Sequence, residues 1–161
     1  MLKKTKMLVV LFMCSIVLLT GCSNSPIPYK KGNIYKKSNT IFVEVIEDNE
    51  WKGIDTYRNK EAFYKIEQME LKAGPYSIIG ISPKGVYSNS HPLGLGDREK
   101  YYIISPMETG FSLLHVGTEK SEEKLWEKFK SKFEKASDKE AFLKKYIGDN
   151  KSRLREYKKT N

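Results

Sequence analysis

The chain has 161 residues and carries 29 lysines and arginines against 20 acidic residues, for a formal net charge of +9 at pH 7. This length suits one domain with a real hydrophobic core and leaves little room for a second. Its only cysteines are Cys14 and Cys22, which excludes a small fold held together by several disulfides.

The first 22 residues have the order of an export signal. Three lysines precede an apolar run from residue 7 to residue 19. That run is shorter than the roughly 20 residues that a membrane-spanning helix needs. It ends in Leu19-Thr20-Gly21-Cys22, a sequence that resembles the lipobox of bacterial lipoproteins.

The resemblance to lipoproteins implies a location and says nothing of an activity. It implies that residues 1–21 are a signal peptide that is removed, and that Cys22 becomes an S-diacylglycerol cysteine. The mature chain would then be anchored on the extracytoplasmic face of a cell membrane, which we expect to be that of a Gram-positive bacterium. Two acyl chains make such an anchor slow to dissociate. An exported location also argues against nucleic acid as a partner.

Residues 22–39 are expected to form a flexible basic tether. The segment has two prolines, no apolar periodicity, and a short repeat in which Tyr29-Lys30-Lys31 recurs as Tyr35-Lys36-Lys37. Because tyrosine favours interfaces and lysine reaches into water, the tether could lie against lipid headgroups or an anionic surface polymer. A plain hydrated linker fits the same composition, and both interpretations stay open.

The folded domain is expected to span residues 40–161, rich in strand over 40–117 and helical over 119–159. Alternating apolar residues predict a strand over 41–46, and a second strand follows a turn, over 51–54. Residues 59–66 are ambiguous, because their apolar positions fit a helical stripe capped by Asn59 as well as a strand. We predict a helix there, with a strand resuming before Gly74.

Four further strands are predicted in the middle of the chain. Residues 76–81 are apolar and β-branched, and Ser82-Pro83-Lys84-Gly85 has the composition of a type I turn before a short partner strand at 86–87. Residues 101–104 and 111–116 form the other two strands. Together these segments predict an antiparallel sheet of about four to six strands.

The sequence pattern of the C-terminal part predicts helices. Ser121 can cap a first helix, and residues 137–140 match a capping box for a second. Each helix has one apolar stripe that we expect to pack on the sheet; the stripes consist of Leu125, Trp126, Phe129 and Phe133, and of Phe142, Leu143, Tyr146 and Ile147. Residues 150–159 are polar and are expected to form a third helix or a frayed tail. The predicted fold class is therefore α+β, with an antiparallel sheet and C-terminal helices packed on it.

Motifs for catalysis and metal binding are weak. Ser121 and Lys124 match the S-x-x-K spelling of penicillin-recognising enzymes, but the companion motifs are absent. His91 and His115 are the only histidines, and a zinc site needs three or four ligands. We therefore expect no catalytic residue, no metal and no cofactor.

The loop over residues 89–97 is the most plausible binding feature. It holds His91 and Asp97 together with glycines and hydroxyl or amide side chains, and it is flanked by Tyr87 and Tyr101. Loops of this composition often carry binding residues on a rigid scaffold. Packing at the edge of a small sheet would explain the tyrosines equally well.

Two functional hypotheses follow. The first is a non-enzymatic accessory or interaction module in the cell envelope, serving exclusion, immunity or a transporter, whose partner is an envelope protein or an anionic surface polymer. The second is a small envelope hydrolase or small-ligand-binding protein that uses the loop around His91.

Overall fold

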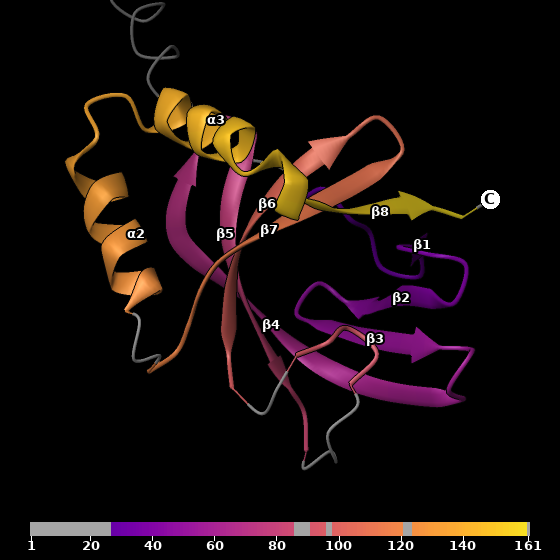
Figure 1. The fold of residues 1–161 in the computed structure, drawn as a ribbon. Helices are drawn as coiled ribbons and strands as arrows, with labels where there is room; N and C mark the ends of the chain where they lie inside the picture. The colour runs from indigo at the N-terminus through magenta and orange to yellow at the C-terminus, as the bar shows by residue number, and fades with distance from the viewer. Residues whose placement is uncertain (1–26, 86–90, 96–97, 121–123, 161) are drawn as a thin grey trace, which may run out of the picture.

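In the computed structural model, eight antiparallel strands close into a barrel in which each strand pairs with its neighbours in the chain and the last pairs with the first (Figure 1). The structure describes residues 27–85, 91–95, 98–120 and 124–160. The strands are β1 (Ile34–Lys36), β2 (Ile41–Glu47), β3 (Glu50–Asp55), β4 (Lys60–Ala73), β5 (Tyr76–Pro83), β6 (Lys100–Met107), β7 (Gly110–Thr118) and β8 (Arg155–Lys159). Between β7 and β8 lie α2 (Leu125–Lys135), α3 (Lys139–Asp149) and a 3-10 turn, η1 (Lys151–Arg153).

The predicted α+β fold, an open sheet of four to six strands, is therefore wrong. β1 pairs with β2 on one side and with β8 on the other, so the sheet has no free edge. Closure pairs the backbone groups that the edges of an open sheet would leave exposed. The C-terminal helices are present, but they pack on the outside of a barrel.

Most predicted strands are confirmed, and one predicted helix is not. The segments at 41–46, 51–54, 76–81, 101–104 and 111–116 lie in β2, β3, β5, β6 and β7. Residues 59–66 lie at the start of β4, which runs for 14 residues without a helix. Pairing with β3 on one side and β5 on the other favours the extended form there. The partner strand predicted at 86–87 lies outside the described residues.

Both ends of the predicted domain need correction. The described part of the expected tether, residues 27–39, belongs to the barrel, because it contains β1 and the buried side chains of Tyr29 and Tyr35. The polar C-terminal tail ends in β8 rather than in a helix. Tyr157 faces inward there, and its ring stacks on Phe111 with 5.0 Å between centroids.

Inward-facing side chains fill the barrel. Alternate residues of each strand point inside. The resulting core is mostly aromatic and β-branched, with Trp51, Tyr64, Phe111 and Tyr157 at 0–1% exposure. One end of this interior is closed by the N-terminal segment: the ring of Tyr29 lies 4.8 Å from Trp51, and its hydroxyl donates to the carbonyl oxygen of Asp48 at 2.8 Å.

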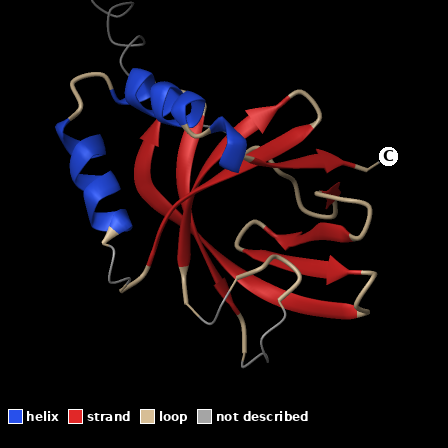
Figure 2. Ribbon diagram, in the orientation of Figure 1, coloured by secondary structure: helices blue, strands red, loops and turns tan. Residues whose placement is uncertain are grey.

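A second core lies outside the barrel, under the helices (Figure 2). Outward-facing residues of β5, β6 and β7 meet the predicted stripe of α2, of which Trp126, Phe129 and Phe133 are buried and Leu125 is not. α3 adds Leu143 and begins one residue later than the predicted capping box, because Asp138 rather than Ser137 is its cap: Asp138 Oδ1 accepts from the backbone N–H of Ala141 at 2.9 Å. The predicted cap at Ser121 lies outside the described residues.

Candidate functional site

The loop predicted to bind a ligand contributes a plug to the barrel. Residues 91–95, which we call the plug segment, lie between β5 and β6. His91, Leu93 and Leu95 are 8%, 2% and 3% exposed. The two leucines belong to the interior core and close the end of the barrel opposite Tyr29.

The two predicted loop residues that the structure describes, His91 and Tyr101, do not come together. His91 is buried in the plug segment, with its ring 6.2 Å from that of Tyr64. Tyr101 faces the outside of the barrel and stacks on Trp126, with 4.1 Å between centroids. Tyr87, Asp97 and the lipidation residue Cys22 lie outside the described residues. His91 and Tyr101 therefore lie on different sides of the barrel wall, and a binding role for the loop with Tyr87 and Asp97 stays a prediction.

Specific contacts hold the plug segment in the barrel. The backbone N–H of Leu93 donates to the Tyr64 hydroxyl at 3.4 Å, and its carbonyl oxygen accepts from Arg155 Nη1 at 3.3 Å. Lys100 Nζ donates to the carbonyl oxygen of Gly94 at 3.3 Å. Gly53 makes room for this arrangement, because a Cβ there would lie 2.7 Å from the Tyr64 ring and 3.2 Å from Leu93 Cγ.

Four basic side chains gather at the plugged end. Lys100 begins β6 and Arg155 begins β8, each two residues from an inward-facing tyrosine, and His115 lies near the end of β7. Lys37 directly follows β1, two residues after buried Tyr35. Alternation puts Lys100, His115 and Arg155 on the inward side of their strands. The charge of Arg155 acts on Lys37, Lys100 and His115, so the four side chains lie near one another. We call Lys37, Lys100, His115 and Arg155 the basic cluster.

These cations influence one another. Burial lowers the pKa of Lys37 and that of Lys100, and the positive charge of Arg155 lowers both further. Burial also lowers the pKa of His115, followed by the charge of Lys100, with smaller effects from Arg153 and Arg155 in the same direction. Both effects favour the neutral form of His115. The physical causes are desolvation and like charge, which both oppose the protonated form.

No carboxylate balances the basic cluster among the residues that the structure describes. None of the ion pairs between described side chains includes Lys37, Lys100, His115 or Arg155. Asp55 is buried on β3, but its Oδ1 accepts from the backbone N–H groups of Tyr57 and Arg58 in its own hairpin, both at 3.1 Å. Counted over the described residues, the local charge of this end is therefore positive.

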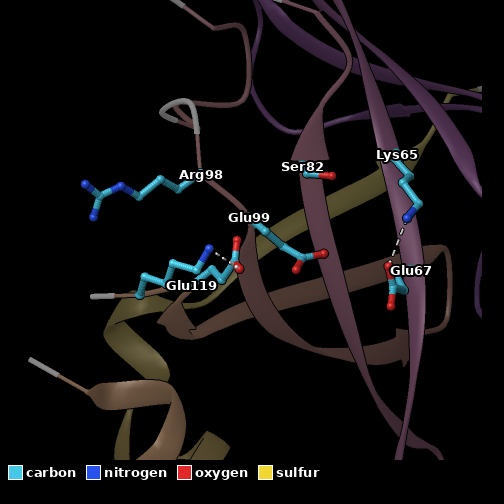
Figure 3. Close-up of a pocket in the computed structure, with 7 residues that line it drawn as sticks. Lys65, Glu67, Ser82, Arg98, Glu99 and Glu119 are labelled. Atoms are coloured by element: carbon cyan, nitrogen blue, oxygen red, sulfur yellow. Dashed lines mark hydrogen bonds and ion pairs between the residues drawn. The ribbon is translucent and has the colours of Figure 1, made fainter. Parts of the chain in front are cut away.

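The outer wall of the barrel carries a larger, open groove of about 480 Å³ (Figure 3). It is lined by Lys65, Glu67, Ser82, Arg98, Glu99, Glu119 and Lys120. Its charges largely compensate one another: Lys65 Nζ lies 3.0 Å from Glu67 Oε2, and Lys120 Nζ lies 3.5 Å from Glu119 Oε1. Exposed pairs of this kind contribute little and do not select a ligand, so the plugged end is the stronger candidate.

The described parts of the chain contain neither a metal-binding cluster nor a membrane-spanning helix. Within these parts no group of three or more histidine, cysteine or acidic side chains is placed to hold a metal ion. No helix within them is long and apolar enough to cross a membrane.

Comparison with known proteins places the chain in a family. A family model described as a family of unknown function, DUF5512, matches residues 21–161. The chain belongs to the DUF5512 family. It is also 41% identical over 152 residues to an uncharacterized protein of Bacillus anthracis, pXO2-32, covering 94% of this chain and 92% of that protein. No solved structure matches the chain.

Sequence analysis of this DUF5512 chain missed the basic cluster, although a signal for it exists. In β6 and β8 a cation stands two positions before a tyrosine that the barrel buries, Lys100 before Tyr102 and Arg155 before Tyr157. A charged residue in the inward phase of an amphipathic strand is unusual, because burial opposes charge. For β8 the signal was hidden, since the segment was taken for a helix or a tail.

Proposed function

We propose that this protein is a lipoprotein, acylated at Cys22 and held on the extracytoplasmic face of a Gram-positive cell membrane, where it serves as a non-enzymatic binding module. The lipobox supports the anchor.

The binding site in this proposal is the plugged end of the barrel, and its ligand carries an anionic group. The observation that carries the proposal is the basic cluster: inward-facing cations that share an end of the interior and have no carboxylate partner among the described residues. Half-buried like charges destabilise the free protein, and an anion bound between them removes that penalty.

The anchor is tested by a Cys22→Ser variant. We expect the variant to accumulate uncleaved and to lose incorporation of labelled fatty acid, because the thiol is the atom that is acylated. Cell fractionation and mass spectrometry of the N-terminus measure both effects. Normal processing and membrane retention of the variant would overturn the proposed location.

The site is tested by anion-specific stabilisation. Every described strand and helix and both cores lie within residues 27–160, so a chain starting at Ser23 carries the whole fold. Phosphate should raise its Tm more than chloride at equal ionic strength, because a ligand of the native state stabilises it. The double variant K100Q/R155Q should lose this effect.

A matched control separates site binding from general screening. Lys158 lies on the same strand as Arg155 but is exposed and ion-paired with Glu156 at 3.7 Å. The variant Lys158→Gln should therefore keep the phosphate effect. An equal effect of phosphate and chloride, or full retention of the effect in K100Q/R155Q, would contradict the proposed site.

A further inference from the structure

The plug segment displays two chemistries within three residues. Its carbonyl oxygens at Leu93 and Gly94 accept hydrogen bonds from Arg155 and Lys100, each at 3.3 Å. Its hydrocarbon side chains, Leu93 and Leu95, are buried in the barrel. The segment thus places oxygen atoms on the cations and branched alkyl groups in the interior.

The cations border the apolar interior directly. A void of about 10 Å³ lies at this end, with room for roughly one water molecule. It is lined by Ile81, Leu93, Leu95, Tyr102, Leu113, Arg155 and Tyr157. The guanidinium of Arg155 therefore stands where the polar mouth meets the hydrocarbon core.

We propose that the ligand of this end is an anionic amphiphile, an alkyl or acyl chain that ends in a phosphate or carboxylate, and that the plug segment occupies its place in the free protein. This inference rests on the proposed function and names the chemistry of its ligand. The head group replaces the carbonyl oxygens of Leu93 and Gly94 on Arg155 and Lys100. The chain replaces the side chains of Leu93 and Leu95 inside the barrel.

Both parts of the ligand follow from the geometry. A head group alone would bind the cations and leave the two leucines in place, so the apolar lining beside Arg155 would go unused. A hydrocarbon alone would displace the leucines and leave the basic cluster without a counter-charge from the described side chains. A charged acceptor forms stronger hydrogen bonds with Arg and Lys than a neutral carbonyl does, so an anionic oxygen can displace the carbonyl oxygens of the plug segment.

Isothermal titration calorimetry of the chain starting at Ser23 tests the inference with three probes. These are decyl phosphate below its micellar concentration, inorganic phosphate, and decanol. We expect decyl phosphate to bind at least about tenfold more tightly than either of the others, since each lacks one of the two interactions.

Two variants locate the binding. Arg155→Gln should weaken decyl phosphate by about tenfold or more, the usual effect of losing a charged hydrogen bond. Because Arg155 also holds the plug segment, Lys37→Gln serves as a second variant. Among the described residues Lys37 makes no hydrogen bond with that segment, and its charge is opposed by burial and by Arg155. The variant should therefore weaken the binding of decyl phosphate without lowering the Tm of the free protein. Lys158→Gln is the control and should bind like the parent chain.

The outcomes separate this inference from the proposed function. If inorganic phosphate binds as tightly as decyl phosphate, the amphiphile is wrong while the anion site stands. If decanol matches decyl phosphate and neither Arg155→Gln nor Lys37→Gln weakens it, the anion site fails as well. Cosedimentation with phosphatidylglycerol vesicles, abolished by Arg155→Gln, would assign the ligand to membrane lipid. Binding of decyl phosphate without cosedimentation would assign it to a free amphiphile.

Discussion

At the scale of single residues, the basic cluster is the feature that packing alone does not explain. Desolvation of a charged group is costly unless an opposite charge or hydrogen bonds compensate it. Arg155 and Lys100 each donate one hydrogen bond to a carbonyl oxygen of the plug segment. No described carboxylate forms an ion pair with either of them. Tyr102 lies in the same buried and positively charged surroundings. Burial raises its pKa to about 12, and the charge of Arg155 opposes that rise.

His115 reports on the cluster through pH. Its pKa in the folded chain lies below the ordinary 6.5, chiefly because of burial and then because of Lys100. The unfolded chain therefore binds the proton more readily, so stability is fully present above pH 6.5 and falls as the pH drops below it. Chemical denaturation at several pH values should show this fall, and His115→Gln should reduce it.

An anion bound at the cluster should raise the pKa of His115. The negative charge favours the imidazolium, so NMR titration of the ring should give a higher pKa in the presence of decyl phosphate than in its absence. An unchanged pKa of His115 under saturating decyl phosphate would show that no anion sits near it.

Gly117 tests the contact between the barrel and α2. A Cβ at Gly117 would lie 2.5 Å from the backbone nitrogen of Trp126, so Gly117→Ala should destabilise the protein by about 1–3 kcal/mol, as overpacking does. Gly148 is the control, because it lies in α3 with nothing within 4 Å of an added Cβ. Gly148→Ala should stabilise by about 0.5–1 kcal/mol. Equal effects of the two substitutions in urea denaturation would contradict the close approach.

At the scale of elements, the sequence was most informative where apolar residues simply alternate. β2, β5, β6 and β7 follow that pattern and were predicted. The second half of β4, before Gly74, was predicted as well, but its first part was taken for a helix, because Ala62 and Ile66 occupy both the inward phase of a strand and the stripe of a helix. The choice depends on pairing with β3 and β5, which lie elsewhere in the chain. Likewise, a loop at 89–97 was predicted, but not that Leu93 and Leu95 would enter the barrel.

The plug segment should open more readily than the strands around it. The contacts described above that keep it in the barrel are a few hydrogen bonds and the burial of two leucines. In contrast, β6 and β7 pair along most of their lengths. Hydrogen exchange should therefore be faster for the amides of Leu93 and Leu95 than for those of Ile103 and Leu114. Equal protection in the two regions would mean that the plug opens only with the whole barrel, and exchange with a ligand would then be slow.

The length of the alkyl chain that the ligand needs follows from the two leucines of the plug segment. Burying a leucine contributes about 1.5–3 kcal/mol, and each buried methylene about 0.8 kcal/mol. A chain of about four to eight methylenes therefore offsets the loss of both leucines from the interior. Decyl phosphate meets that requirement, and shorter alkyl phosphates should bind progressively more weakly.

At the scale of the whole molecule, closure of the barrel could not be predicted. It depends on two short strands near opposite ends of the chain, β1 and β8, joined where Tyr35 pairs with Lys159 and Lys36 with Lys158. Neither strand has a local signature, since lysines surround the few apolar residues of both. Their inward positions are recognised only once the neighbouring strands β2 and β7 provide the surfaces on which they pack.

Tyr157 tests this closure. Its ring is 1% exposed and stacks on Phe111 inside the barrel. Replacement of Tyr157 by alanine should cost about 3–5 kcal/mol, the usual loss for a large buried aromatic side chain. Urea denaturation followed by circular dichroism provides the value. A cost below about 0.5 kcal/mol, typical of an exposed site, would mean that β8 is not part of the cooperative barrel.

The most direct test of the account maps the ligand on the protein. Backbone NMR of the chain starting at Ser23, titrated with decyl phosphate, should shift the amides of Leu93 and Leu95 and those near Lys100 and Arg155, at the plugged end. Resonances of β4 around Glu67, in the outer groove, should stay in place. Shifts confined to that groove, or no shifts at all, would contradict a binding site inside this end of the barrel.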